Sequence, residues 1–221
     1  MSMFQVKGAT LLSLAVAMSA GSVVAQAQDA TSQSHPRLSP ARDVTVVYAV
    51  QPEKMPKPVQ AIVQFKAEGD KLRIDSPDHA GSTILDRPAQ RVTLIMHKQR
   101  VYTSFSPKHG LRNPFMLDMA MQYAPDGTGS VAGLACNKWT ITSSHGKATA
   151  CVTEDGVILS EEGVDADGLH GKLEAQTVTY GPVAEAQFQA PADYQQITAQ
   201  MPIPHGGGVH GGGAMSSAAP K

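Results

Sequence analysis

The two cysteines are the first residues of this sequence whose type and spacing could do chemistry. Cys136 and Cys151 are its only cysteines, and they lie too far apart to form the Cys-x-x-Cys motif of a thiol oxidoreductase. In an exported chain such a pair favours one structural disulfide, Cys136–Cys151. A hairpin that carries this bond is centred on Ser143 and Ser144. Directly opposed Cα atoms then approach to about 4.5–5.5 Å, which a disulfide tolerates.

Histidines and acidic residues offer only weak metal sites. His205 and His210 lie in a glycine-rich tail and supply two ligands, where a fixed transition-metal site needs three or four. The run Asp165-Ala166-Asp167-Gly168 resembles the start of a calcium loop but lacks the later ligands. We therefore expect no metal centre and no cofactor.

No catalytic motif is found either. Glu161 and Glu162 are adjacent and would point apart on a strand, so they do not form a paired-carboxylate acid–base site. The sequence lacks Gly-x-Ser-x-Gly, His-Glu-x-x-His and a glycine-rich phosphate loop. We expect a protein that is not an enzyme. A buried Ser or Asp within hydrogen-bond reach of a His in a cleft would instead favour a hydrolase.

Methionines gather where an apolar helix is expected. Asn113 is a good N-cap and Pro114 suits the first helical position. The residues that follow, up to Tyr123, are apolar on nearly all sides, so a helix there must be covered on nearly all sides. The run holds three methionines: Met116, Met119 and Met121. Because methionine adapts to irregular partners, they favour either a cavity for varied apolar ligands or plain filling of the core around a plug helix.

Period-two alternation predicts the sheet that positions these residues. We expect strands at Arg42–Val50, Val59–Ala67, Lys71–Asp75, Ser82–Asp86, Arg91–Met96, Arg100–Phe105, in both arms of the cysteine hairpin, at Val157–Ser160 and Leu169–Tyr180, with a last edge segment at Phe188–Ile197 and a loop at Glu161–Gly168. Short connections between successive strands imply an antiparallel meander. The expected fold is mainly β (α+β), a curved half-barrel around one apolar helix.

Alternation also assigns the faces of the cysteine hairpin. Trp139 and Ile141 fall on the face that carries Ala148, Ala150 and Val152, and we expect this face to be the core. Both cysteines fall on the other face, which we expect to be the outer, wetter one. The prediction places the disulfide outside and the only tryptophan inside.

The two ends of the chain set its expected boundaries. Residues 1–27 have a basic start, a short apolar core and Ala25-Gln26-Ala27, which is typical of a cleaved secretory signal peptide. An N-terminal membrane anchor is the alternative, but the apolar run is shorter than the roughly 20 residues of a spanning helix. Residues 28–41 are expected to form a flexible leader, 42–198 a single domain, and 199–221 a disordered Gly/His-rich tail. A net charge of −1 gives no argument for binding nucleic acid.

The order of these features resembles a group of uncharacterised exported bacterial proteins. The resemblance rests on Lys71-Leu72-Arg73-Ile74, on Cys136 with Trp139, on the run from Cys151 through Asp155-Gly156 to Leu159, and on Phe188, Pro191 and Tyr194. It covers Arg42 to Ile197. The fold of that group is similar to the LolA/LolB lipoprotein-carrier half-barrel, in which an antiparallel sheet curls around a helical plug over an apolar cavity. No catalytic residues come with the resemblance.

Together these expectations favour a non-enzymatic periplasmic binding or carrier protein for an apolar ligand such as a lipid or acyl chain. The expected lining is Phe65, Leu72, Ile74, Leu94, Met96, Phe115, Met119 and Trp139. The alternative is a structural or protein-interaction module of the envelope, with no small-molecule ligand, that binds an envelope protein along an open sheet edge. We expect no transmembrane segment after signal cleavage.

Overall fold

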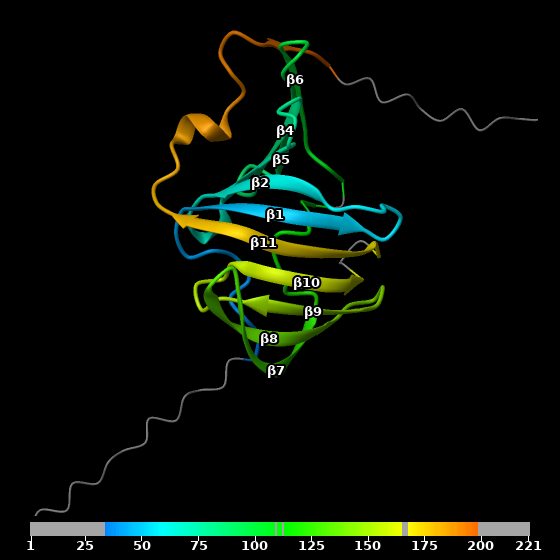
Figure 1. Cartoon of the computed structure of the whole chain (residues 1–221). Coiled ribbons are helices and arrows are strands. Elements are labelled where there is room, and N and C mark those ends of the chain that lie inside the picture. The colour runs from blue at the N-terminus through cyan, green and yellow to red at the C-terminus, as the bar shows by residue number, and fades with distance from the viewer. Residues whose placement is uncertain (1–33, 109, 112, 165–167, 199–221) are drawn as a thin grey trace, which may run out of the picture. The chain divides into compact units, whose positions relative to one another are not determined.

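The computed structural model describes residues 34–108, 110–111, 113–164 and 168–198. The predicted signal peptide and Gly/His-rich tail lie outside these residues. The described residues form one twelve-stranded sheet (Figure 1). Its strands are β1 (Val44–Pro52), β2 (Val59–Phe65), β3 (Lys71–Asp75), β4 (Gly81–Asp86), β5 (Arg91–Met96), β6 (Val101–Phe105), β7 (Gln122–Val131), β8 (Leu134–Thr142), β9 (Lys147–Val152), β10 (Ile158–Val164), β11 (His170–Tyr180) and β12 (Gln195–Gln196).

The sheet consists of two meanders joined through the first strand. Its order is β12-β6-β5-β4-β3-β2-β1-β11-β10-β9-β8-β7. β1 pairs with β2 on one side and with β11 on the other, which places the first strand in the middle. Every described pairing is antiparallel except that of β12 with β6. The mainly-β antiparallel prediction is therefore confirmed.

The core lies on the inner face of the sheet, which alternation selects residue by residue. On β1 the side chains of Val44, Val46 and Tyr48 are fully buried, while the residues between them are half-buried. The Tyr48 hydroxyl donates a hydrogen bond to the carbonyl oxygen of Ile158 at 2.8 Å. This bond satisfies the one polar atom of a side chain that the core otherwise surrounds with apolar groups.

The predicted plug helix is wrong. No α-helix occurs in the described part of the chain, and residues 113–121 form irregular turns. Asn113 Oδ1 accepts a hydrogen bond from the Phe115 amide at 2.9 Å, as in a cap, but Phe115 and Leu117 are the buried residues. Residues two positions apart lie on different faces of a helix. Residues 113–121 therefore lie against the sheet as an irregular segment, which we call the strap.

Residues 34–41, assigned to a flexible leader, also lie against the sheet. Pro40 is fully buried, and Leu38 packs against the core. The Leu38 carbonyl oxygen accepts a hydrogen bond from the Leu117 amide at 3.1 Å. The two irregular segments therefore contact each other on the inner face.

Two further strands differ from the prediction. β7 begins at Gln122, at the end of the segment expected to be helical, and covers residues for which no strand was predicted. β10 extends to Val164, into the predicted Glu161–Gly168 loop. The pairing of β7 with β8 shifts register between Pro125 and Thr128. β7 is an edge strand, and an edge tolerates proline and a bulge because one side of its backbone needs no partner strand.

The cysteine hairpin has the predicted bond and faces but a different register. Cys136 and Cys151 form a disulfide with a Cα–Cα distance of 5.4 Å. Cys151 lies opposite Lys138, and Trp139 lies opposite Ala150, so the two cysteines are diagonal rather than opposed. Both are about 95% buried, so their face is not the wetter one that we expected.

The C-terminal residues cross the outer face of β3–β6. A small cluster of Ile84, Ile95, Val183 and Phe188 is buried there, and Figure 1 shows this segment in orange. Asp43 anchors it by accepting hydrogen bonds from the Val183 amide and from Lys66 Nζ, both at 2.9 Å. Burial alone would raise the pKa of Asp43, but these bonds outweigh burial and lower it.

Candidate ligand-binding pockets

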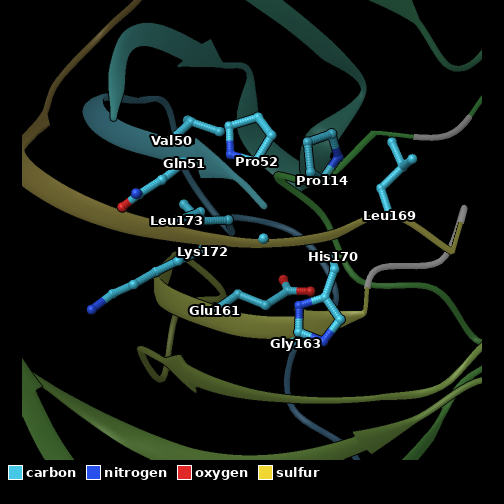
Figure 2. A pocket seen from close by; sticks show the side chains of 11 residues that line it. Val50, Gln51, Pro52, Pro114, Glu161, Gly163, Leu169, His170, Lys172 and Leu173 are labelled. Carbon is cyan, nitrogen blue, oxygen red and sulfur yellow. The ribbon is translucent and has the colours of Figure 1, made fainter. Parts of the chain in front are cut away.

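Two pockets open on the inner face. Pocket A lies over the end of β1 and has a volume of about 160 Å³. Its lining consists of Val50, Gln51, Pro52, Pro114, Glu161, Gly163, Leu169, His170, Gly171, Lys172 and Leu173. Figure 2 shows Val50, Pro52, Pro114 and Leu169 around the hollow, with the amine of Lys172 pointing away. The walls of pocket A are thus mainly aliphatic.

Pocket A exists because three adjacent strands lack bulky side chains at one level of the sheet. Pro52 pairs with Gly171, Gly171 with Gly163, and Gly163 with Ala148. One level further in, Val50 pairs with Leu173 and Leu173 with Glu161. Gly163 has φ 134°, and a Cβ there would lie 2.4 Å from the Lys147 carbonyl oxygen. Only glycine fits this position, because a side chain there would clash with the backbone of β9.

Pocket B lies between β3 and β4 of the sheet and the strap that replaces the predicted helix. Its volume is about 180 Å³, and its lining consists of Leu38, Leu72, Leu85, Arg87, Leu111, Asn113, Met116, Leu117, Asp118, Met119 and Met121. Leu72 pairs with Leu85 on the sheet side.

Phe115 lines neither pocket, but its two neighbours in the strap line one pocket each. Pro114 lines pocket A and Met116 lines pocket B, while the Phe115 ring lies 5.2 Å from the Tyr48 ring between centroids. Tyr123, at the end of the strap, lies edge-on to Trp139 with 6.5 Å between ring centroids. Burial raises the pKa of Tyr123 to about 12, so this hydroxyl is neutral at physiological pH.

The eight residues predicted to line a cavity lie in several places. Leu72 and Met119 line pocket B, and none of the eight lines pocket A. Phe65, Phe115 and Trp139 are buried, and Leu94 is exposed. Ile74 and Met96 are half-buried. Their role in binding stays a prediction. Sequence reasoning missed pocket A, whose signal was the pair of glycines, Gly163 and Gly171, in strands of otherwise bulky residues.

A serine, a histidine and an aspartate do meet on the outer face. Ser82 is 4% exposed, and its Oγ lies 2.7 Å from His97 Nε2. Ser82 Oγ donates to Asp75 Oδ1 at 2.5 Å and accepts from Arg73 Nη2 at 2.9 Å. His97 Nδ1 lies 3.1 Å from the Tyr194 hydroxyl.

The proton count of this cluster differs from that of a nucleophilic triad. A serine hydroxyl has one proton, and here Asp75 receives it, so His97 Nε2 must donate to Ser82. A nitrogen that donates has no lone pair with which to accept the Ser82 proton, whereas a triad places the carboxylate on the histidine. Neither Ser82 nor His97 lines pocket A or pocket B. The cluster fixes Tyr194 and the C-terminal segment to the sheet.

The bond between the cysteines bears on the compartment. Disulfides persist in oxidising compartments and are rare in the cytosol. Cys136–Cys151 therefore indicates an extracytoplasmic location. In the described part of the chain, no helix has the length and apolar character needed to cross a membrane.

Comparison with known proteins places the chain beside others of unknown function. Residues 52–160 match the family model of a domain of unknown function, DUF4412. No curated protein matches the sequence. The predicted resemblance to uncharacterised proteins is thereby confirmed.

One solved structure shows a similar fold at low sequence identity, and two others are weaker matches. An uncharacterized conserved protein from Thermus thermophilus has a TM-score of 0.50 and 12% identity, over 72% of this chain and 91% of that one. MucB of Pseudomonas aeruginosa, solved with MucA, has a TM-score of 0.48 and 16% identity, over 71% of this chain and 58% of that one. A putative outer membrane lipoprotein-sorting protein domain from Vibrio parahaemolyticus has a TM-score of 0.37 and 12% identity, over 69% and 92%.

Proposed function

We propose that this chain is a non-enzymatic, periplasmic binding or carrier protein that holds an apolar ligand, such as an acyl chain of a lipid, in pocket A. The observation that carries the proposal is the mainly aliphatic hollow whose lining includes the paired glycines Gly163 and Gly171. Ligand pockets are typically concave, mostly apolar and largely pre-formed. A hollow whose floor is glycine backbone keeps its shape without a ligand.

The size of pocket A fits the end of an acyl chain rather than a whole lipid. A dry cavity of about 150 Å³ binds benzene-sized molecules, and pocket A has about 160 Å³. Six buried methylenes contribute about 5 kcal/mol at about 0.8 kcal/mol each. Leu169 is 68% exposed at the rim, where further methylenes of the chain would contact it.

Trp139 provides the test, because the sequence has only one tryptophan. The sheet order places three strand spacings between Trp139 on β8 and Leu173 on β11, which is about 14 Å. Energy transfer from Trp139 to a fluorescent polyene fatty acid should therefore be efficient when the probe occupies pocket A. We expect saturable transfer and competition by unlabelled fatty acids, together with lipid in organic extracts of the purified protein.

The variant Leu169→Gln gives the specific test, since an exposed side chain can change without loss of fold. We expect a five- to tenfold weaker affinity for the probe, in line with about 1 kcal/mol of lost apolar contact. Met119→Gln, at the rim of pocket B and equally exposed, is the matched control and should bind the probe as the wild type does. The absence of both probe binding and extractable lipid would refute the proposal.

A protein-binding module of the envelope is the second candidate, and the open edge of β7 favours it. β7 has ten residues and pairs only with β8 in the sheet order, so one side of its backbone could take up a strand of a partner. Recovery of one stoichiometric protein from envelope extract, lost on Thr128→Pro and without any bound lipid, would favour this candidate over the first.

A further inference from the structure

Three methionines of one short segment line pocket B together. Met116, Met119 and Met121 follow the pattern Met-x-x-Met-x-Met, and all three belong to the lining. Because residues 113–121 form turns rather than a helix, the usual helical spacing does not explain why they meet. The strap brings three methionines to the lining of one hollow.

Core filling accounts for these methionines incompletely. Met116 and Met121 are half-buried against the core, but Met119 is 69% exposed, the largest exposure among the large apolar residues of the described chain. An apolar side chain gains nothing from water at the mouth of a pocket. The Tyr123 hydroxyl donates to the Asp118 carbonyl oxygen at 2.7 Å and lies 3.5 Å from the Sδ of Met121, so Tyr123 contacts the strap beside that sulfur.

The thioether has a chemistry that the aliphatic walls of pocket A lack. It is a soft, polarisable and uncharged donor, and soft thioether and thiolate ligands select Cu(I) among the biological metals. Three neutral sulfurs suit a monovalent cation, whereas divalent cations of harder character prefer imidazole and oxygen. Both cysteines are oxidised to a disulfide, so methionine is the soft ligand type available within the described residues.

The charges around pocket B are compatible with a monovalent cation. Asp118 lines the pocket and supplies one negative charge. Arg87 also lines it, but its Nη1 donates to the carbonyl oxygens of Glu68 and Gly69, both at 3.4 Å. These contacts orient the guanidinium toward the backbone of the β2–β3 turn.

We propose that pocket B is a binding site for a soft monovalent cation, Cu(I) with Ag(I) as its redox-inert analogue, ligated by the thioether sulfurs of Met116, Met119 and Met121. The site does not involve pocket A, so this proposal is independent of the proposed acyl-chain function.

Silver ion alone is the probe, because it needs no reductant and leaves the Cys136–Cys151 bond intact. We expect calorimetry of the full chain to give one Ag(I) per chain. The ε-methyl signals of Met116, Met119 and Met121 should shift in NMR spectra while that of Met55 stays fixed. Trp139 emission should change in parallel, because Tyr123 connects Met121 to the indole ring.

Leucine variants separate thioether ligation from packing, since leucine keeps the volume and loses the sulfur. Met119→Leu, at an exposed position, should weaken Ag(I) binding at least tenfold without affecting the fold. The triple variant Met116→Leu, Met119→Leu, Met121→Leu should abolish it. Met55→Leu with Met96→Leu is the matched control and should bind as the wild type does.

Two results would overturn the proposal. One is unchanged Ag(I) affinity in Met119→Leu and in a folded triple variant. The other is loss of binding in a His205→Ala, His210→Ala variant that retains all the methionines, which would assign the ion to the tail histidines. If the triple variant does not fold, the Ag(I) affinity of Met119→Leu and the methyl shifts of the wild type test the proposal.

Discussion

Pockets A and B are similar in volume and lie on the same face, yet their walls are built in different ways. In pocket A the hollow comes from missing side chains, at Gly163 and Gly171 of paired strands. In pocket B it lies under an irregular strap whose flexible methionines form one wall. A hollow formed by strand backbone has one shape, whereas a hollow closed by long unbranched side chains adapts to what enters it. One sheet thus offers a rigid and an adaptable site.

Removal of the side chain between the two pockets should have the largest effect. Phe115 is 5% exposed and packs on Tyr48, so Phe115→Ala should lower the free energy of unfolding by about 3–5 kcal/mol. Denaturant unfolding measures this loss. The same variant should alter binding of both the fatty-acid probe and Ag(I).

Phe188→Ala is the control for that variant. Phe188 is 6% exposed on the outer face, so its loss destabilises the fold by a similar mechanism but leaves both pockets intact. Unchanged ligand binding in Phe115→Ala would mean that Phe115 does not separate two sites.

Loss of the disulfide should have the next largest effect. Cys136 and Cys151 are 15 residues apart in sequence, and a loop of this size corresponds to about 3 kcal/mol of stability in the chain-entropy treatment. We expect this decrease in the double variant Cys136→Ser, Cys151→Ser, by denaturant unfolding. Probe binding to pocket A should survive well below the melting temperature, since β10, β11 and β1 supply its walls. Loss of probe binding in the folded variant would show that the shape of pocket A depends on the cysteine hairpin.

Acid should weaken the pocket B end of the sheet in particular. Asp155 accepts hydrogen bonds from Thr153 at 2.6 Å and from Tyr180 at 3.0 Å, and its carbonyl oxygen accepts one from Ala41, next to the segment that carries Leu38. Burial tends to raise the pKa of Asp155, but its hydrogen bonds, including that from Arg42, outweigh burial and lower it.

A lowered pKa fixes the sign of this pH effect. The ionised Asp155 contributes stability that is fully present above the unfolded-state pKa of about 3.9, and that is lost as the pH falls through the lower folded-state value. Asp155→Asn should therefore lower the free energy of unfolding by about 1–2 kcal/mol at pH 7. The gap between variant and wild type should close below about pH 4. A difference in unfolding free energy between variant and wild type that does not change with pH would contradict the assignment of this effect to the ionised Asp155.

The smallest effects on stability should come from the pair Leu169→Gln and Met119→Gln, at 68% and 69% exposure. Each should change the free energy of unfolding by less than about 0.5 kcal/mol. Each should weaken one ligand only, the fatty-acid probe for Leu169→Gln and Ag(I) for Met119→Gln. Titration of both variants with both ligands checks this. A variant that weakens the binding of both ligands would show that the two pockets act as one site.

The sheet was predictable where alternation is regular, and the failures have physical causes. The hairpin of Val59–Ala67 with Lys71–Asp75 alternates cleanly, and β2 and β3 lie there. The strap failed because a cap motif at Asn113 and an all-apolar run are equally compatible with an irregular segment buried at Phe115 and Leu117. The local sequence does not show that this segment packs on the face of a sheet.

The pockets were less predictable than the sheet because they depend on register. The pairing of Gly163 with Gly171 joins β10 and β11, and Gly163 lies in the part of β10 that was expected to be a loop. The cysteine register was displaced because the turn spans Ser143 to Gly146, where the Ser143 amide donates to the Gly146 carbonyl oxygen. Alternation still assigned the faces correctly, because a displacement of two residues preserves parity.

The central place of β1 has a consequence for how the chain is made. Val44 pairs with Tyr180, so β1 lacks one neighbouring strand until the residues up to Tyr180 have been synthesised. The meanders of β2–β6 and β7–β10 consist of neighbours in sequence and can form early, whereas closure through β11 is slow because its contacts are distant in the chain. Until then β1 is an unpaired apolar edge, the kind of surface that chaperones protect. Formation of this sheet is therefore completed by β11.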